Sequence, residues 1–384
     1  MNAVLYNRET PLLDLTITSG HIIEIGKVRN FDLLPIIVHR PIAARDGSPE
    51  KERAAINALS TWFAKRTIPA AREGMREARL YFQNFEAIRT GASLSDQYWI
   101  RFRRQDRWST VNFFTNAYTE AVGDVQFLPW AVKKEDLEKP SPDRTTNGLA
   151  RKQWVQDPAT MVSYLYKSGS AKHRHEPLSE CLSSLVMEKF RLLPYVKYDL
   201  CIHHLVMCSK CRNFVTPDTE FVPAKHVYSD VPFQKGEGKF DHLVRAAELY
   251  GVANPQKYLY HLILADLLIG NSDRHLGNFG FIRDVHTGKI TGFAPVFDFG
   301  DSFPVKPRDD ATRATFFDEK RTYVLQHYAS QVPADVFRLK QSLYLIVDRY
   351  PDLTDLEKQA VKEGIEEREK IFLKPGKERG AMCR

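Results

Sequence analysis

The chain has 384 residues, 43% of them hydrophobic and 27% charged, which is the composition of a globular protein with about two or three domain-sized units. No apolar run approaches the roughly 18 residues of a membrane-spanning helix, and the first residues lack the basic and apolar regions of a signal peptide, so we expect a cytoplasmic protein without membrane contact. A net charge of +7 is too small to indicate direct nucleic-acid binding, and an odd number of cysteines, five, argues against a disulfide framework.

The N-terminal part of the chain begins with short β-prone runs. LLDLTITSG, HIIEIGKV and LLPIIVHR are separated by glycine and proline, and they predict a small sheet within residues 4–45. From residue 48 to about residue 76 the apolar residues have helical spacing, which predicts an amphipathic helix. The apolar face of this helix comprises Ile56, Leu59, Trp62 and Phe63.

A dense aromatic segment follows and is typical of a core or of a seam between domains. Its members are Trp99, Trp108, Phe113, Phe114, Phe127 and Trp130. The stretch KKEDLEKPSPD at residues 133–143 is charged, contains proline and lacks periodicity, so we expect a domain boundary there. Residues 1–135 would then be an accessory N-terminal module.

The polar turn TTNGLARKQW occupies residues 145–154 and contains one glycine, Gly148, followed by Lys152. Turns of this kind can direct backbone N–H groups toward phosphate oxygens. A single glycine is also common in ordinary hairpin turns, so the turn alone does not identify a phosphate site.

The next elements are a strand and a helix that carry opposite charges. The run MVSYLYK predicts a strand that ends at Lys167. Residues 177–190 have helical spacing, with Glu180 inside the predicted helix and Glu176 just before it. Either glutamate could pair with the lysine, and the spacing does not choose between them.

Residues 195–214 are expected to form two strands and a connector. This segment contains Cys201, His203, His204, Cys208 and Cys211, a combination that permits a zinc site. Structural zinc sites usually present two separated pairs of ligands, whereas these residues occupy one short stretch. Ordinary buried cysteines are therefore favoured, and zinc stays open as an alternative.

The most informative stretch runs from Asn254 to Ser302. Asn254 and Pro255 have the features of a helix start, Gly270 has those of a helix end, and the mostly apolar run between them predicts a buried helix. A polar loop, NSDRHLGN at residues 271–278, comes next. Two β-prone runs at residues 279–283 and 290–297 then predict a hairpin.

This hairpin suggests a metal site. If it is centred near Gly288, Asn278 and Asp298 lie opposite each other, roughly 4.5–5.5 Å apart, at its open end. Asp273 lies just before them in the loop. Two oxygen ligands with a neighbouring carboxylate are suited to Mg²⁺ on substrate phosphates, while the other carboxylate could orient a hydroxyl nucleophile.

The pattern Asn271-x-Asp273-x-His275-x-x-Asn278, followed after the hairpin by Asp298-Phe-Gly, resembles the HipA-like serine/threonine kinases. These are bacterial enzymes and often the toxin of a toxin–antitoxin pair. Phosphoinositide kinases have a similar Asp-Arg-His-x-x-Asn motif and a later Asp-Phe-Gly. The segment CSKCRNFVT, with EFVPA after it, is similar to a bacterial and phage-borne branch of HipA-like proteins and has no obvious counterpart in lipid kinases.

The resemblance implies a two-lobed α+β fold of the protein-kinase type. Its N-lobe would comprise residues 136–213. Residues 214–384 would form an α-rich C-lobe, with helices over residues 332–350 and 353–373, and would end in a disordered basic tail at residues 374–384.

The resemblance also implies ATP and Mg²⁺ as cofactors and a role for each site residue. Asp273 would orient the hydroxyl, Asn278 and Asp298 would hold Mg²⁺, and Lys167 with Glu180 would grip the phosphates. His275 would support the loop backbone, whereas Arg274 would either neutralise a phosphate or face solvent.

The family modifies itself on a hydroxyl residue of its phosphate-binding loop. In this sequence that loop would include Gly148 and Lys152, and the modified position falls on Thr145, with Thr146 adjacent. The implied partners are a protein substrate and a small DNA-binding antitoxin.

Three alternatives remain open. A phosphoinositide or small-molecule kinase would share the metal geometry but have a different acceptor pocket. A pseudokinase regulator would bind nucleotide without transferring phosphate. A zinc-dependent module would use Cys201, Cys208 and Cys211.

Overall fold

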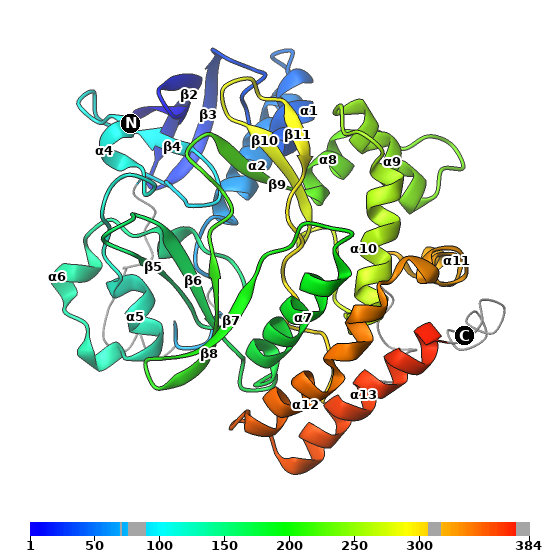
Figure 1. Cartoon of the computed structure of the whole chain (residues 1–384). Helices are drawn as coiled ribbons and strands as arrows, with labels where there is room; N and C mark the ends of the chain where they lie inside the picture. Colours follow the sequence, from blue (N-terminus) through cyan, green and yellow to red (C-terminus); the bar gives the residue numbers. More distant parts are fainter. Residues whose placement is uncertain (70, 76–89, 306–315, 374–384) are drawn as a thin grey trace. The chain divides into compact units, whose positions relative to one another are not determined.

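The computed structural model describes residues 1–69, 71–75, 90–305 and 316–373. Figure 1 labels the helices and strands of these residues. The described residues fall into two compact units, each assembled from separated segments. Unit 1 consists of Met1–Tyr166, Arg212–Phe233 and Phe281–Phe293, and unit 2 consists of Lys167–Cys211, Gln234–Gly280 and Ala294–Arg384. The division at residues 1–135, 136–213 and 214–384 stays a prediction. The predictions for the tail at 374–384 and for the end of the helix at 76 lie outside the described residues.

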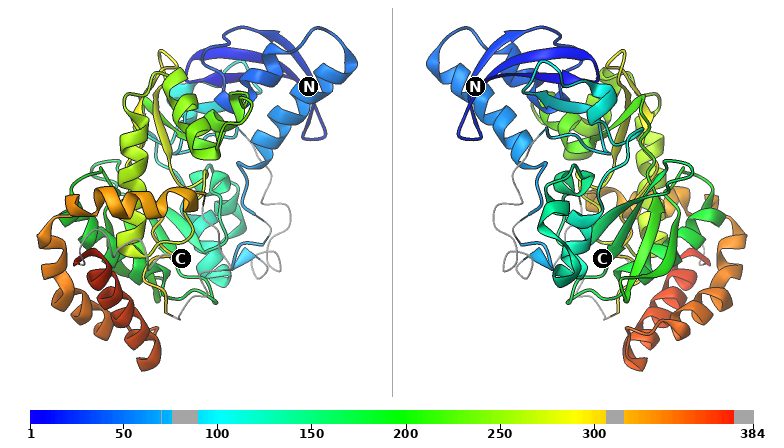
Figure 2. Two further views of the ribbon diagram at one scale, coloured as in Figure 1. Left: turned by 90° about the vertical axis from the view of Figure 1, so that its right-hand side faces the viewer. Right: turned by 90° about the vertical axis from the view of Figure 1, so that its left-hand side faces the viewer.

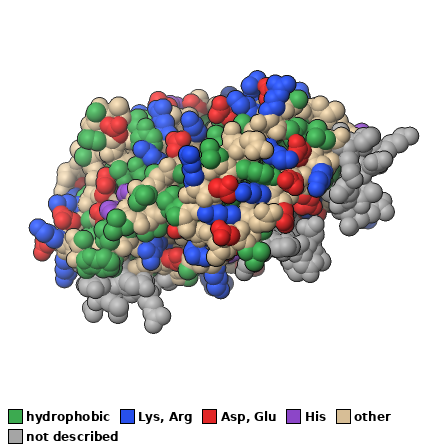
Figure 3. Space-filling model, turned by 60° about the horizontal axis from the view of Figure 1, so that its bottom comes forward, with side chains coloured by type: hydrophobic (Ala, Val, Ile, Leu, Met, Phe, Trp, Pro, Cys, Tyr) green, Lys and Arg blue, Asp and Glu red, His purple; other side chains and the backbone are tan. Residues whose placement is uncertain are grey.

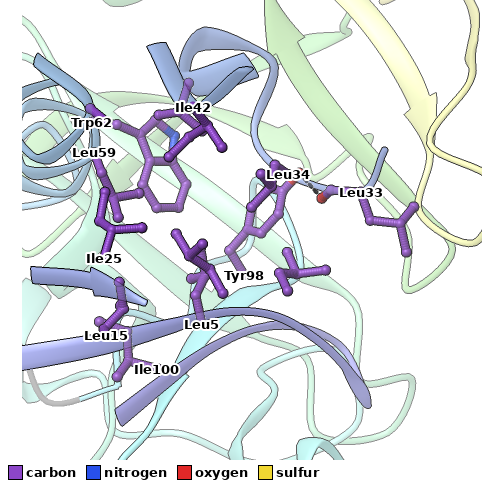
Figure 4. Close-up of a cluster of buried hydrophobic side chains, with 14 of the residues drawn as sticks. Leu5, Leu15, Ile25, Leu33, Leu34, Ile42, Leu59, Trp62, Tyr98 and Ile100 are labelled. Carbon is purple, nitrogen blue, oxygen red and sulfur yellow. Dashed lines mark hydrogen bonds between the residues drawn. The ribbon is translucent and has the colours of Figure 1, made fainter. Parts of the chain in front are cut away.

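Unit 1 begins with an antiparallel sheet in the order β3-β2-β1-β4. Its strands are β1 (Asn2–Asn7), β2 (Thr10–Thr18), β3 (His21–Val28) and β4 (Tyr98–Arg101). Helix α2 (Pro49–Ala64) packs its apolar face against this sheet. Leu59 and Trp62 of α2 point toward Leu5, Leu15 and Ile100 of the sheet, as Figure 4 shows. The predicted sheet is thus confirmed for these strands, and the predicted helix is confirmed as far as Ala64. Its predicted continuation toward residue 76 is wrong where the structure describes it, because residues 65–69 and 71–74 are not helical.

The predicted third strand, LLPIIVHR, is wrong. Residues Ile36–Val38 form a 3₁₀ turn (η1), and His39–Ala43 form helix α1. A half-buried strand would bury only alternate side chains, whereas the neighbours Leu33 and Leu34 are both buried here, at 6% and 0% exposure. The place beside β1 is taken by β4, which comes much later in the sequence.

Unit 1 contains several short helices and turns and two further groups of strands. The helices are α4 (Trp108–Val111), α5 (Ala121–Phe127), α6 (Lys134–Leu137) and α8 (Ala224–Asp230), with 3₁₀ turns η2 (Pro129–Ala131) and η3 (Pro142–Thr145). The strands are β5 (Lys152–Gln156), β6 (Ser163–Ser168), β9 (Thr219–Pro223), β10 (Gly280–Asp284) and β11 (Ile290–Phe293). Strands β11, β10 and β9 form a sheet in that order. Trp99, Trp108 and Phe113 form a buried cluster, which confirms a core role for these aromatics, whereas Trp130 is 70% exposed.

The hairpin formed by β10 and β11 exists as predicted, but its register differs. Phe281 lies opposite Phe293 and Ile282 lies opposite Gly292, so the ladder centres on residue 287 rather than on Gly288, and a bulge follows Ile282. The last hydrogen bond at the open end joins the Ala294 N–H to the Gly280 carbonyl. Asn278 and Asp298 therefore do not pair in this ladder, and the register argument that placed them opposite each other is wrong.

Unit 2 is mainly helical. Its helices are α7 (Glu176–Phe190), α9 (Lys239–Leu249), α10 (Pro255–Ile269), α11 (Asp318–Tyr328), α12 (Lys340–Arg349) and α13 (Asp355–Leu373), with 3₁₀ turns η4 (Ala329–Gln331) and η5 (Ala334–Leu339). Helices α12 and α13 pack side by side (Figure 2). The predicted helix over 353–373 is confirmed as α13, whereas the one over 332–350 is confirmed only from Lys340, because η5 precedes it. Strands β7 (Tyr198–His203) and β8 (Val206–Arg212) form an antiparallel hairpin.

Helix α10 has the predicted bounds and burial. Pro255 occupies its first turn, where its missing N–H costs no hydrogen bond, and Gly270 ends it with a left-handed φ of 67°. Every residue from Leu259 to Ile269 is buried. Asn254 precedes the helix, but its side chain makes no capping hydrogen bond, so its expected capping role is wrong.

The surface carries both signs of charge. On the face drawn in Figure 3, basic and acidic side chains are intermixed with apolar ones, in keeping with the modest net charge of +7. Within the described part of the chain, no helix has both the length and the apolar character needed to cross a membrane.

Candidate active site

Lys167 is the centre of a cluster of charges in unit 2. It lies at the end of β6, and its Nζ is 3.0 Å from Glu180 Oε1, 3.2 Å from Asp298 Oδ1 and 3.5 Å from Glu176 Oε2. Both glutamates considered in the sequence therefore contact the lysine. The Lys167 side chain is only 15% exposed, so these ion pairs are largely shielded from water.

The charge of Lys167 is stabilised by its neighbours. Burial alone would lower the pKa of this lysine, but the carboxylates of Glu180, Asp298 and Glu176 outweigh burial and raise it well above its usual value. Burial raises the pKa of Glu176, while Lys167 opposes that rise. Lys167 therefore remains positively charged, and a bound anion could form charge-assisted hydrogen bonds with it alongside the carboxylates.

Helix α7 is fixed from two sides. The Ser209 hydroxyl on β8 donates to Glu180 Oε2 and also, at 3.4 Å, to the carbonyl of Lys167. The Ser179 hydroxyl donates to the Ser302 carbonyl at 2.6 Å. Because the Glu180 side chain is 1% exposed, its position is determined by the protein rather than by solvent.

The loop after α10 is held by its own side chains. The Asn278 amide donates to the Asp273 carbonyl at 2.7 Å, and its Oδ1 accepts the His275 N–H at 3.0 Å. The His275 Nδ1 accepts the Gly277 N–H at 2.9 Å, which agrees with the expected role of His275 as a scaffold for the backbone. Asp273 itself is exposed, so a substrate hydroxyl can approach its carboxylate.

Arg274 is buried beneath this loop, with a side chain 1% exposed, so the expectation that it might face solvent is wrong. Its Nη2 and Nε donate to the two oxygens of Asp266, at 2.9 and 3.0 Å. Its Nη1 donates to the carbonyls of Asn278 and Phe297, at 2.9 and 2.7 Å. Every nitrogen of the guanidinium is used inside the protein.

Asp298 has an unusual backbone. Its φ is 59°, a left-handed conformation that an aspartate adopts only at some cost. Its N–H donates to the Tyr198 hydroxyl at 3.2 Å, and its carboxylate contacts Lys167. The side chain is 40% exposed, so one side of the carboxylate is open to a ligand.

The donor chemistry of these residues fits Mg²⁺. Asn278 and Asp298 supply an amide oxygen and a carboxylate, which are hard ligands, and phosphate oxygens would complete the shell. Arg274 brings the two segments together by binding the carbonyl of Asn278 and that of Phe297, the residue before Asp298. Among the residues that the structure describes, no group of three or more His, Cys, Asp or Glu side chains could hold a metal ion.

The turn at residues 145–154 belongs to unit 1. Arg72, buried at 2% exposure, donates to Thr146 Oγ1 at 2.7 Å, to the Thr146 carbonyl at 2.8 Å and to the Gly148 carbonyl at 2.9 Å. Gly148 has a φ of 97°, and an added side chain there would collide with Lys152 Nζ. The Thr145 and Thr146 hydroxyls donate to the carbonyls of Pro142 and Asp143.

Among the described residues, the cysteines of β7 and β8 form no disulfide bond. Cys201 lies opposite Cys208 in the hairpin, and Cys211 lies opposite Tyr198. Cys208 is fully buried and Cys211 is 8% exposed, so the favoured interpretation of ordinary buried cysteines agrees with their positions.

Sequence reasoning did not identify Asp266, Ser209, Tyr198 and Arg72. Each acts by holding another residue in place, and each comes from an element separated in the chain from the residue that it holds. Asp266 left one signal, because a lone carboxylate in the otherwise apolar stretch LILADLLI requires a buried partner.

No protein-family model matches the sequence, and no curated protein matches it significantly. Among solved structures, the chain is similar to HipA of Shewanella oneidensis MR-1, determined in a complex of a toxin–antitoxin system with HipB and operator DNA. The TM-score is 0.57 at 13% identity, and the match covers 99% of both chains. The chain also matches the Helicobacter pylori proinflammatory kinase CtkA, with a TM-score of 0.46 at 16% identity over 62% of this chain and 92% of that one. The predicted α+β, HipA-like fold is confirmed by the likeness to HipA.

Proposed function

We propose that this protein is an ATP- and Mg²⁺-dependent serine/threonine protein kinase. The observation that carries the proposal is the contact of Lys167 with both Glu180 and Asp298. Kinases use a strand lysine, a helix glutamate and the aspartate of Asp-Phe-Gly for phosphates and metal, and this chain has the three in one cluster. The HipA-like fold gives these residues a consistent setting.

Each proposed site residue of unit 2 then has a defined role. Lys167 binds the phosphates of ATP while Glu180, anchored by Ser209, holds the lysine in position. Mg²⁺, when bound, neutralises charge on the transferring phosphoryl group. Asn278 and Asp298 present oxygens for it, and the exposed Asp273 orients the attacking hydroxyl and accepts its proton.

We further propose that the kinase phosphorylates itself on Thr145 or Thr146. The Thr146 hydroxyl accepts a hydrogen bond from Arg72 Nη1, so a phosphate placed there would gain a cationic partner. Both hydroxyls donate to backbone carbonyls, and this turn must therefore open before either can react. Gly148 and Lys152 of the same turn are proposed to contact the ATP phosphates.

The test is incubation with labelled ATP and Mg²⁺, followed by mapping of the modified residues. Wild type is expected to carry label on Thr145 or Thr146, whereas Asp273→Asn and Asp298→Asn carry none. Asp348→Asn on α12 is the matched control, because this aspartate is 53% exposed and its carboxylate pairs with Lys362 of α13, away from the proposed site residues. Equal labelling of all four proteins would remove the proposal.

The same assay separates the alternative functions. If ATP were consumed only in the presence of inositol lipids or aminoglycosides, the protein would be a lipid or small-molecule kinase and not a protein kinase. Binding of ATP without any transfer would identify a pseudokinase. Since the similar HipA was determined together with HipB and operator DNA, we also propose a small DNA-binding partner, and its co-purification with the tagged protein from the native cells would support this.

A further inference from the structure

We infer that Arg274 is a positioning residue that sets the separation between Asn278 and Asp298. This inference rests on the proposed function, since it concerns the two residues proposed to hold Mg²⁺. Arg274 would touch neither metal nor substrate and would act through the backbone alone.

The first observation is the double contact of one nitrogen. Nη1 of Arg274 donates to the carbonyl of Asn278 at 2.9 Å and to the carbonyl of Phe297 at 2.7 Å. The first carbonyl belongs to a proposed ligand, and the second belongs to the peptide that leads into the other ligand, Asp298. The Nη1 atom of Arg274 therefore connects the segment that carries Asn278 to the segment that carries Asp298. In the proposed function the side chains of these two residues bind the same Mg²⁺ ion.

The hairpin does not provide this connection. The ladder of β10 and β11 ends at the bond between Ala294 and Gly280, and so it stops before either ligand is reached. Beyond that bond, the carbonyls of Asn278 and Phe297 share Arg274 as a common donor.

The guanidinium itself is fixed to α10. Asp266 accepts from Nη2 at 2.9 Å and from Nε at 3.0 Å, a two-point contact that determines the plane of the group. Asn271 Nδ2 donates to Asp266 Oδ1 at 3.0 Å, and Asn271 Oδ1 accepts the N–H of Asp273. Asp266 thus connects the loop at residues 271–278 to the buried part of α10.

The charge of Arg274 persists in this setting. Burial would lower its pKa, but Asp266 outweighs burial and raises it. A charged donor in a site shielded from water makes stronger hydrogen bonds to carbonyls than a neutral donor. A lysine would keep the charge but lose the planar fork, and it cannot bind Asp266 at two points while also reaching both carbonyls.

The test is Arg274→Lys, measured as the transfer rate against Mg²⁺ concentration at saturating ATP. A second measurement, independent of transfer, is the rise of the thermal midpoint with Mg²⁺ concentration in the presence of a non-hydrolysable ATP analogue. Residues that orient metal ligands typically change metal affinity by about 10- to 100-fold when substituted. We therefore expect the half-saturating Mg²⁺ concentration to rise by about 10-fold or more. Asp266→Asn, which retains one acceptor oxygen, should shift it in the same direction by less and serves if Arg274→Lys does not fold.

The matched control is Arg283→Lys in unit 1. Arg283 is also 1% exposed and paired with a buried carboxylate, Glu220, at 2.8 Å. Both arginine variants should lower the thermal midpoint, but only Arg274→Lys should change the Mg²⁺ requirement. A loss of stability alone reduces the folded fraction without altering the half-saturating Mg²⁺ concentration of the molecules that remain folded.

The outcomes are distinguishable. An unchanged Mg²⁺ requirement in folded Arg274→Lys would overturn the inference and leave the proposed function intact. An equal shift in Arg283→Lys would also overturn it, because the effect would then follow from destabilisation. A wild-type protein without Mg²⁺-dependent transfer would overturn the proposed function and the inference together.

Discussion

Arg274 in unit 2 and Arg283 in unit 1 have side chains equally buried, at 1% exposure, and each is paired with a carboxylate. Arg283 binds the buried groups Glu220, the Tyr98 hydroxyl and the carbonyl of Leu34. It also donates to the carbonyls of Asp32 and Gly288, and none of these partners is a proposed site residue. Arg274 instead lies below Asp273 and Asp298, which are exposed or partly exposed. The Arg283 pair therefore has a role in the fold alone, whereas the Arg274 pair also holds the backbone next to Asp298 and can support the proposed chemistry.

The largest expected effect separates activity from stability in unit 2. Asp273→Asn should lower the rate of phosphoryl transfer by about 10²- to 10⁴-fold, because the hydroxyl loses the base that orients it. The side chain is exposed, so the free energy of unfolding should stay within about 0.5 kcal/mol of wild type. Initial-rate kinetics and chemical denaturation measure the two quantities. Comparable transfer rates in variant and wild type would show that Asp273 has no such role.

In unit 1 we expect a substitution that lowers stability and leaves the transfer rate unchanged. Glu220→Gln should lower the free energy of unfolding by about 3–5 kcal/mol, because it leaves Arg283 buried without its ion partner and arginine cannot neutralise itself by losing a proton. The rate per folded molecule should match that of wild type. Urea denaturation with parallel rate measurements checks both statements. A stable but inactive variant would contradict the structural role assigned to this pair.

A smaller effect is expected at Lys167. Charge-assisted hydrogen bonds contribute about 1.5–3 kcal/mol, so Lys167→Met should lower kcat/KM for ATP by about 10- to 150-fold. Glu176 provides the control, because its contact with the lysine is longer, at 3.5 Å, than that of Glu180, at 3.0 Å. Glu176→Gln should therefore lower kcat/KM less than Glu180→Gln. The opposite order would make Glu176 the functional partner.

The sequence predicted the helices and strands that depend on local patterns of residues. The bounds of α10, the strand that ends at Lys167 and the helix that carries Glu180 all follow from periodicity and from proline and glycine signals. The grouping of Lys167 with Asp298 was accessible only through the family resemblance.

Features that depend on distant segments were not predictable in the same way. The turn of the hairpin pairs Arg283 with Ile290, and the bulge then shifts the ladder by one residue, so that Ile282 lies opposite Gly292. Gly292 is a residue type typical of bulges, but it gives neither the centre of the turn nor the final register. The pairing of Arg274 with Asp266 required knowing that both are buried, which the loop sequence alone does not reveal. β4 joins β1 across a long separation in the chain, and this left LLPIIVHR without a place in the sheet.

The last effect, which is the smallest for each unit step in pH, concerns Asp143, a buried carboxyl of unit 1. Burial raises the pKa of Asp143 to about 8, although the Trp154 N–H and Arg72 lower it. The folded state therefore keeps a proton on Asp143 between about pH 4 and pH 8, where the unfolded chain has lost it. Since the folded state binds more protons there, stability should fall as the pH rises, by at most about 1.4 kcal/mol per pH unit.

Asp143→Asn removes this titrating group and keeps an oxygen that can accept the Trp154 N–H, which now donates to Asp143 Oδ1 at 2.8 Å. Its free energy of unfolding should therefore change less than that of wild type between pH 5 and pH 8, in urea titrations at each pH. Identical pH profiles would mean that Asp143 is already ionised in the folded protein. Arg72 would then have an ionised carboxylate nearby, and a phosphate on Thr146 would gain less from this arginine than proposed, because the two anions would compete for one cation.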